Sequence, residues 1–393
     1  MEAQKIKDGL YWVGALNPNL RVFDIILYTP HGTSYNSYFI KAEKTVLIDT
    51  VYRKFTQSLV DRVGSVTNLQ DIDFIVANHT EMDHSTALAN LLKLAPQATV
   101  VSTAAGAKFL KNILNTDFKS MIVKDNDTID LGNKQLKFIT VPFWHWPDTM
   151  FTYLVEDKTL FTCDGFGSHF CDERLFDDKI DDFSEDFKLY YNVIMRPFRR
   201  KIAEGLKKIE DLEIEIIAPS HGPVLRTNPS KYIKLYEEWS RPKEERTVLV
   251  FYDSIYGNTR QMAEEIGKGV SAQNMQVKLM EASKINLEEV KEEVEKAAGL
   301  MFGSPTVNND AVKPIWDIIS TFFDIETKGK KGAAFGSYGW SGEAVKLIEE
   351  RLKGLHINIP VPGLRVNFTP DQSDVKDCFE FGKNFARTLG TGH

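Results

Sequence analysis

The chain has 393 residues, which is enough for two or three domains that each bury a sizeable core. Its composition, 42% hydrophobic and 26% charged residues, is ordinary for a folded soluble protein and excludes a disordered chain. The formal net charge of −7, without a dense run of Lys and Arg interleaved with aromatic residues, argues against a nucleic-acid partner.

No apolar run approaches the length that a membrane-spanning helix needs, and the N-terminal residues lack a signal-peptide pattern, so we expect a cytoplasmic protein without membrane association. The cysteines Cys163, Cys171 and Cys378 are scattered, and we expect reduced thiols. The less favoured alternative is a soft metal ligand from the Cys163 and Cys171 pair. A fused rubredoxin or zinc ribbon would need four cysteines in two pairs, so an iron–sulfur electron donor is expected to be a separate protein.

Up to about residue 240, short apolar runs typical of strands, such as residues 45–48 and 98–101, are mixed with helical stretches such as residues 197–212. The polar segment 240–246 then indicates a boundary, with Pro242 expected to end the preceding helix. We therefore divide the chain into a domain of residues 1–245 and a domain of residues 246–393.

Residues that can ligate a metal follow several apolar runs of the first domain. Four of them fall within six positions after the run 75–77, namely His79, Glu81, Asp83 and His84, and three more, His145, Asp164 and His221, follow the runs 136–143, 159–161 and 215–219. Strands that end at one rim of a scaffold would bring these seven side chains together. Two metal ions need about six or seven donors, so the set predicts a dinuclear site.

Glu81 indicates which metal the site prefers. The pattern His-x-Glu-x-Asp-His places a carboxylate where many two-zinc hydrolases have a further imidazole. A larger share of oxygen donors favours iron or manganese over zinc, and iron is our first choice.

After residue 246, predicted strands and helices alternate. Four strands, 248–252, 277–280, 299–303 and 332–336, are each followed by a helix, near residues 259–272, 287–298, 312–323 and 343–353, and a last strand and helix complete the chain. Five such units in a domain of this length predict a doubly wound parallel sheet of flavodoxin-like size.

Three loops at the carboxyl ends of these strands have the residues of a ligand site. The first contains Ser254, Ile255, Tyr256, Gly257, Asn258 and Thr259, the second Ser304, Pro305, Thr306 and Asn308, and the third Ser337, Tyr338, Gly339 and Trp340. The first loop opens into a helix, whose free N–H groups suit a phosphate. Trp340 and Tyr338 offer flat apolar partners for an isoalloxazine ring. The alternative is a domain of this fold that binds no flavin.

A nicotinamide cofactor is disfavoured, because the chain lacks a Gly-x-Gly-x-x-Gly motif with its ribose-binding acid.

The segments His79–His84, Trp144–Asp148 and Ser220–Gly222, together with Asp164, resemble the flavodiiron proteins over essentially the whole chain. The resemblance implies a metallo-β-lactamase-like αββα sandwich that holds two non-haem irons, followed by a flavodoxin-like domain that holds FMN. It also implies the iron ligands. His79, Glu81 and His145 would bind one iron, Asp83, His84 and His221 the other, and Asp164 would bridge them. Some family members turn the imidazole that matches His84 away from the metal.

The same resemblance implies that the protein reduces dioxygen to water, nitric oxide to nitrous oxide, or both. Electrons would pass through FMN from rubredoxin or from a reduced deazaflavin coenzyme, in a head-to-tail homodimer or a dimer of dimers. We expect His169 and one of the neighbouring Tyr190 and Tyr191, with Tyr191 as our choice, to supply hydrogen bonds or protons near the irons.

Two other functions remain open at this level. The first is a dinuclear-metal hydrolase of the metallo-β-lactamase type with an appended flavodoxin domain, which Glu81 disfavours. The second is an electron-transfer protein whose metal domain is only structural. The bulky Trp144, where smaller aliphatic residues are expected, either narrows the approach to the metals or fills the core.

Overall fold

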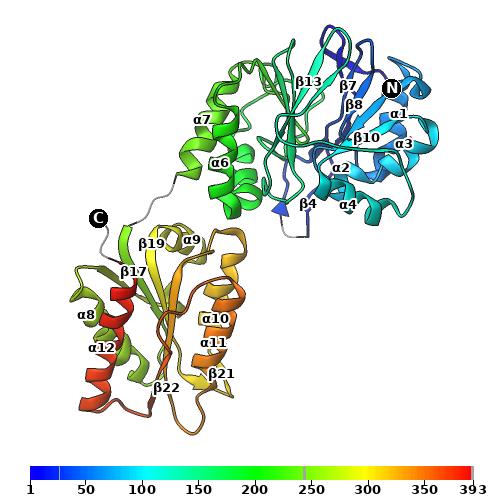
Figure 1. Ribbon diagram of the computed structural model, residues 1–393. Helices are drawn as coiled ribbons and strands as arrows, with labels where there is room; N and C mark the ends of the chain where they lie inside the picture. The colour runs from blue at the N-terminus through cyan, green and yellow to red at the C-terminus, as the bar shows by residue number, and fades with distance from the viewer. Residues whose placement is uncertain (26, 242–244, 391–393) are drawn as a thin grey trace. The chain divides into compact units, whose positions relative to one another are not determined.

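The computed structural model describes residues 1–25, 27–241 and 245–390, and the chain forms two compact units, Met1–Arg241 and Pro242–His393 (Figure 1). Pro242, which the sequence predicts to end a helix, lies outside the described residues. Within the described ranges, no helix is long and apolar enough to cross a membrane.

Two sheets form the centre of the first unit. The first sheet has the strand order β1 (Gln4–Lys7), β2 (Leu10–Trp12), β7 (Tyr38–Ile40), β8 (Val46–Ile48), β9 (Phe74–Val76), β10 (Thr99–Ser102) and β11 (Ser120–Ile122). The second has the order β12 (Thr128–Asp130), β13 (Gln135–Thr140), β14 (Met150–Leu154), β15 (Thr159–Cys163) and β16 (Ile216–Pro219). Two small sheets pair β3 (Ala15–Asn17) with β6 (Thr33–Tyr35) and β4 (Val22–Phe23) with β5 (Leu27–Tyr28).

Helices cover the outer faces of both sheets (Figure 1). On the side of the first sheet lie α1 (Thr56–Gly64), α2 (Met82–Ser85), α3 (Leu88–Leu94) and α4 (Ala104–Leu114). On the side of the second sheet lie α6 (Arg199–Ile209) and α7 (Pro229–Ser240), and α5 (Ser184–Tyr190) packs into the same apolar cluster. Short 3-10 turns occupy Arg53–Phe55, Leu69–Asp71 and Arg196–Phe198, and the π-helical turn η3 spans Tyr191–Met195. The expected helix over 197–212 begins later, at Arg199, because Pro197 lies in the preceding 3-10 turn.

The alternation of side chains along each strand explains why the sheets stack. In β8, Val46 and Ile48 enter the core between the two sheets, whereas Leu47 enters the core under α1 and α3. In β13, Phe138 faces the core between the sheets, and Ile139 faces the core under α6 and α7. The first unit therefore has the expected αββα order of layers.

The second unit is built on one parallel sheet. Its strand order is β18 (Gln276–Glu281), β17 (Glu245–Tyr252), β19 (Ala297–Gly303), β22 (Lys331–Tyr338) and β23 (Leu364–Asn367). Helices α8 (Asn258–Ser271) and α12 (Gln372–Thr388) cover one face, and α9 (Leu287–Lys296), α10 (Lys313–Ser320) and α11 (Glu343–Gly354) cover the other, with a 3-10 turn at Thr321–Asp324. This is the doubly wound order, and it confirms the predicted fold class.

The alternation of strands and helices is interrupted once. After β19, a small hairpin of β20 (Thr306–Val307) and β21 (Asp310–Ala311) precedes α10. Its turn consists of Asn308 and Asn309, whose φ angles are 51° and 62°. Asparagine tolerates this left-handed region better than other side chains do, so the Asn-Asn pair makes the hairpin turn possible.

Candidate metal centre

The metal-ligand candidates come from loops after strands of both sheets and from the short helix α2, which holds Asp83 and His84. Strand β9 ends shortly before His79, β15 ends immediately before Asp164, and β16 ends two residues before His221. His145 instead lies within the connection between β13 and β14, where its φ angle is 29°. The loop start before His79 is fixed by the buried Asp49, which accepts hydrogen bonds from Asn78 N at 2.7 Å and Asn78 Nδ2 at 2.9 Å.

The first group of donors consists of His79, Glu81 and His145. The Nε2 atoms of His79 and His145 lie 3.3 Å and 3.2 Å from Glu81 Oε2. The same two nitrogens lie 3.4 Å and 2.9 Å from Asp164 Oδ2. One carboxylate oxygen from each acid therefore faces both imidazoles.

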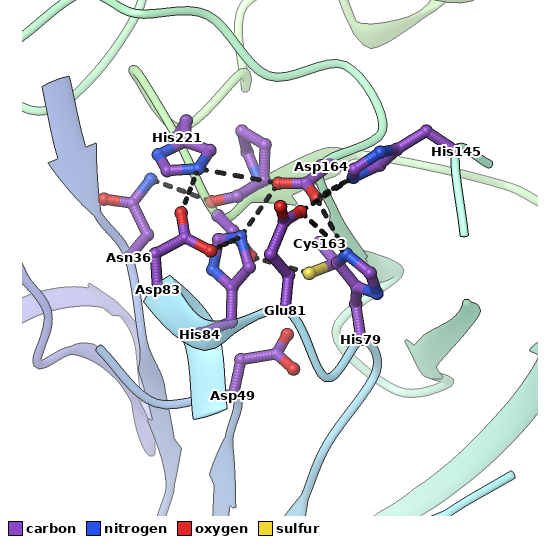
Figure 2. Close-up of polar contacts among 12 residues, drawn as sticks. Asn36, Asp49, His79, Glu81, Asp83, His84, His145, Cys163, Asp164 and His221 are labelled. Carbon is purple, nitrogen blue, oxygen red and sulfur yellow. Dashed lines mark hydrogen bonds and ion pairs between the residues drawn. The ribbon is translucent and has the colours of Figure 1, made fainter. Parts of the chain in front are cut away.

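The second group consists of Asp83, His84 and His221. His84 Nε2 lies 3.3 Å from Asp83 Oδ1, and His221 Nε2 lies 3.1 Å from Asp83 Oδ2. These nitrogens face the other oxygen of the shared acid, because Asp164 Oδ1 lies 3.0 Å from His84 Nε2 and 3.6 Å from His221 Nε2. Figure 2 shows Asp164 between the two groups, and the structure thus brings all seven predicted side chains together.

The spacing of the donor atoms fits a pair of metal ions. Two ligand atoms that each lie about 2.1 Å from a metal, at an angle of about 90°, are about 3.0 Å apart, which is close to the separations found here. Several of these buried atoms have no hydrogen-bond partner among the described residues, including both oxygens of Asp83, Asp164 Oδ1 and both ring nitrogens of His84. Buried polar groups are normally satisfied, so these unpaired atoms are suited to ligate cations.

The electrostatics of the two groups agree with this reading. Burial alone would lower the pKa of His79 and of His145, but neighbouring carboxylates raise each pKa to about 10. Burial would raise the pKa of Asp164, yet His84 and His145 hold it well below its ordinary value. In the metal-free protein, protonated imidazoles therefore balance the charge of the buried acids. Metal cations can replace the protons on these imidazoles.

A second layer of residues orients the first group. Asp148, which is buried, lies 3.3 Å from His79 Nδ1 and accepts hydrogen bonds from the backbone and hydroxyl of Thr80, both at 2.8 Å. A carboxylate behind a metal-ligating imidazole fixes its orientation and raises its basicity. The ring of Trp146 packs against His79 with centroids 5.2 Å apart.

Of the residues expected to supply protons, His169 lies beside the second group. Its ring is 5.1 Å from that of His221 and 4.9 Å from that of Tyr190. Burial and the neighbouring His221 hold the pKa of His169 well below its ordinary value, so it is neutral. Tyr191 is placed differently, because its hydroxyl forms a hydrogen bond of 2.9 Å with Ser240 Oγ at the end of α7. Tyr190, not Tyr191, is the tyrosine that faces His169 and His221.

Trp144 fills the core. Its side chain is fully buried between Phe151, Phe166 and Tyr236, and its Nε1 donates to the carbonyl oxygen of Lys201 at 3.2 Å. A Cβ atom at Gly205 of α6 would lie 2.2 Å from Trp144 Nε1, so the indole occupies the space that this glycine leaves.

A pocket of about 650 Å³ leads to the donor groups, and Glu81, Asp83 and Trp146 are part of its wall. Apolar side chains from the β4–β5 hairpin and from α4 line much of the rest, including Val22, Phe23 and Phe109. Its size and apolar character suit the passage of a small uncharged molecule.

The cysteines are free thiols, and Cys163 and Cys378 are buried. Cys163 Sγ lies within 4.8 Å of donor atoms of His84 and Asp164, and it also accepts a hydrogen bond from Ser220 Oγ at 3.2 Å.

The flavin loops of the second unit surround a separate pocket of about 220 Å³. Ten predicted residues line it, namely Ser254, Ile255, Tyr256, Asn258, Pro305, Thr306, Ser337, Tyr338, Gly339 and Trp340. Ser254 Oγ is buried without a hydrogen-bond partner in the described ranges, and Gly257, with a φ angle of 90°, caps α8 without a side chain. An unpaired hydroxyl at an open helix start fits the phosphate of FMN.

The other predicted flavin residues support the loops from behind or lie in a turn. Thr259 Oγ1 bonds to Ser337 Oγ at 2.8 Å, Ser304 Oγ accepts from Val312 N at 3.0 Å, and Asn308 forms the β20–β21 turn. The sequence reasoning missed Phe368, which lines the same pocket just after β23. The available signal was its position, since the ends of all strands of such a sheet border the ligand crevice.

Comparisons with known proteins agree with both units. Residues 33–222 match the family described as ODP family beta lactamase, and residues 250–382 match the flavodoxin family. The flavo-diiron protein FprA2 of Clostridium acetobutylicum is 42% identical, over 99% of this chain and 100% of that protein. The nitric oxide reductase of Moorella thermoacetica is 37% identical, over 98% of both chains. The solved rubredoxin oxygen:oxidoreductase of Desulfovibrio gigas is similar with a TM-score of 0.69 and 29% identity, over 99% of this chain and 98% of that one.

Proposed function

This chain belongs to the flavodiiron protein family, and we propose that it reduces dioxygen or nitric oxide at its diiron centre with electrons that pass through FMN. The names of the relatives support the reduction of either gas, since one relative is a nitric oxide reductase and another is a rubredoxin oxygen:oxidoreductase. The single observation that carries the proposal is the position of Asp164, whose two oxygens face two separate groups of donors.

We propose that His79, Glu81 and His145 bind one iron, that Asp83, His84 and His221 bind the other, and that Asp164 bridges them. When bound, the two irons and FMN supply enough electrons to reduce dioxygen to two waters, or to couple two molecules of nitric oxide to nitrous oxide and water. The protein side chains hold the two metal positions at a fixed separation. Asp164 contributes to this, because it is buried and contacts both groups.

Protons are needed for both reactions, and Tyr190 is the candidate to deliver them. Its ring contacts His169 and His221, at 4.9 Å and 6.0 Å between centroids, and it is buried next to the second group. Burial holds the pKa of Tyr190 well above its ordinary value. The hydroxyl therefore keeps its proton until a strongly basic acceptor is present beside it. His169, which is neutral, would orient that hydroxyl or a water.

The proposed electron donor is reduced rubredoxin or a reduced deazaflavin coenzyme. We also propose the family's head-to-tail dimer, in which the FMN of one protomer lies beside the irons of the other. Mixing an iron-site variant, His145→Ala, with an FMN-site variant, Ser254→Ala, tests this assembly. Mixed dimers with one complete pair of sites should regain turnover, and no gain over either variant alone would contradict the arrangement.

The metal site is tested by comparing two histidine variants. His145→Ala should retain FMN but lose iron and gas consumption. His31→Ala is the matched control, because His31 pairs with Asp186 at 3.0 Å and half of its side chain is exposed. An iron-replete, active His145→Ala protein would contradict the ligand assignment. The hydrolase alternative is not favoured, and its signature would be zinc, without iron, in protein purified anaerobically.

A further inference from the structure

The backbone fixes the tautomer of His221. Its Nε2 faces Asp83 Oδ2 at 3.1 Å, whereas its Nδ1 lies 2.6 Å from the carbonyl oxygen of Ser34 in β6. A carbonyl oxygen can only accept a hydrogen bond, so His221 Nδ1 carries the proton. The lone pair of Nε2 is therefore available to a metal in the second group.

The hydroxyl of Thr33 lies between His221 and His169. Its Oγ1 is 3.2 Å from His221 Nδ1 and 2.9 Å from His169 Nδ1. A longer contact of 3.3 Å joins Oγ1 to the carbonyl of Ser34. Because the hydroxyl has one proton, it donates along the shortest contact, to His169. It accepts from His221 the longer arm of a shared hydrogen bond, whose shorter arm goes to the Ser34 carbonyl. His169 Nδ1 is then the acceptor, and its Nε2 carries the ring proton.

Packing keeps this arrangement in place. Thr33 is fully buried and His169 is 4% exposed, so water does not compete for the hydroxyl. The His169 ring lies 4.4 Å from the ring of Phe23 and 4.9 Å from that of Tyr190. The three residues Thr33, His169 and His221 therefore form one hydrogen-bonded unit in an apolar surrounding, where such bonds are strengthened.

The two metal groups differ in how their histidines are supported. His79, in the first group, lies against the carboxylate of Asp148 at 3.3 Å, which is a charged partner. Among the described residues, the Nδ1 atom of His221, in the second group, has only the Ser34 carbonyl and the Thr33 hydroxyl as hydrogen-bond partners. A change to the Thr33 side chain therefore removes one of the two hydrogen-bond partners of His221 Nδ1 and leaves the Asp148 partner of His79 unchanged.

We propose that Thr33 is a positioning residue for the second metal position, and that its hydroxyl joins His169 to His221 and thereby sets the affinity of the Asp83, His84 and His221 group. The inference rests on the ligand set given under the proposed function. It assigns to a hydroxyl the role that Asp148 has in the first group.

Thr33→Val tests the proposal, because valine has nearly the shape of threonine but lacks the hydroxyl. Metal-free full-length protein is titrated anaerobically with Co²⁺ by calorimetry, and the binding steps are assigned with His145→Ala and Asp83→Ala. Thr33→Val should weaken the step that Asp83→Ala removes by about 10- to 100-fold, the usual loss for an outer partner of a metal-ligating histidine. The step that His145→Ala removes should stay within about twofold of the unmodified protein, and Thr33→Ser should restore the weakened step.

Two results would overturn the proposal. One is an unchanged second step in Thr33→Val, and the other is an equal weakening of both steps with a lowered melting temperature, which is what a purely structural role predicts. A failed ligand assignment is recognised separately, because Asp83→Ala would then leave both steps intact whatever happens at Thr33.

A second variant keeps the test available if Thr33→Val does not fold. His169→Phe should weaken the same step, since it removes the acceptor of the Thr33 hydroxyl. In the double variant the two losses should not add, because both changes break one hydrogen-bonded unit. Unchanged Co²⁺ binding in His169→Phe, or fully additive losses, would contradict the coupling of the two residues.

Discussion

Trp144→Ala should destabilise the first unit by about 4–6 kcal/mol. Replacement of a fully buried tryptophan by alanine costs about 3–5 kcal/mol, because transfer free energy is lost and a cavity remains. The hydrogen bond from Trp144 Nε1 to the carbonyl of Lys201 adds about 1 kcal/mol. The indole packs against three aromatic rings, at centroid distances of 4.9, 5.6 and 5.9 Å, so the site cannot easily collapse.

Urea unfolding of the metal-free protein, followed by circular dichroism, measures this loss. Trp340→Ala is the matched control, because it also removes one tryptophan but from a side chain that is 86% exposed. The control should change the free energy of unfolding by less than about 0.5 kcal/mol. A loss of less than about 1 kcal/mol in the free energy of unfolding for Trp144→Ala would refute the conclusion that Trp144 is a core residue. Removal of a well-packed indole costs more than that.

The burial of Trp144 also bears on the preference for dioxygen or nitric oxide. Among the described residues, those that line the pocket above the metal groups do not include Trp144. Trp144→Phe, which keeps an aromatic ring in the core, should therefore leave the ratio of dioxygen to nitric oxide turnover unchanged. A clear shift in that ratio would mean that Trp144 acts on the approach to the irons after all.

Three further outcomes are expected. Asp148→Asn should weaken metal binding at the His79 position by about 10- to 100-fold in a Co²⁺ titration, since the imidazole loses its charged partner; an unchanged affinity would contradict this. Ser254→Ala should weaken FMN binding by about tenfold or more in a fluorescence titration, without loss of iron, because its buried hydroxyl is expected to bond a charged phosphate; parallel loss of iron would count against separate sites. In metal-free protein, Asp148, Glu81 and Asp164 overcome the effect of burial and raise the pKa of His79 to about 10. Asp164 and Glu81 do the same for His145, whose pKa is also raised to about 10. A raised histidine pKa gives stability that is complete below about pH 6.5 and is lost as the pH rises through about 10, so unfolding of EDTA-treated protein should become easier from pH 7 to pH 10. Stability that increases from pH 7 to pH 10 would contradict the raised pKa values of these histidines.

The sequence was informative where residues of one site share a short motif or a common strand end. The segment from His79 to His84, and the loops at the ends of β17, β19 and β22, could be located without coordinates. Several strands could also be located, because a strand between two cores is a continuous apolar run. In Val46, Leu47 and Ile48, the outer two side chains enter one core and the middle one enters the other.

Other features depend on contacts that no local pattern encodes. The hydrogen bond between Thr33 and His169 joins residues 136 positions apart, and the bond between Tyr191 and Ser240 joins residues 49 apart. Neighbouring helical residues point about 100° apart, so the choice between Tyr190 and Tyr191 requires the actual course of α5 into the π-helical turn. His145 lies in the connection between β13 and β14 rather than at a strand end, and its positive φ angle of 29° is uncommon for a histidine, so a local sequence pattern does not predict it.

The most direct test of the proposed function is gas consumption by iron- and FMN-replete protein with reduced rubredoxin, measured amperometrically with dioxygen and, in a separate anaerobic run, with nitric oxide. The account predicts that at least one gas is consumed, with four electrons used per dioxygen and little peroxide, or two electrons per two nitric oxides with nitrous oxide as product. His145→Ala should abolish this consumption. Oxidation of the FMN by either gas at an equal rate in His145→Ala, or peroxide as the main product, would contradict reduction at the diiron centre.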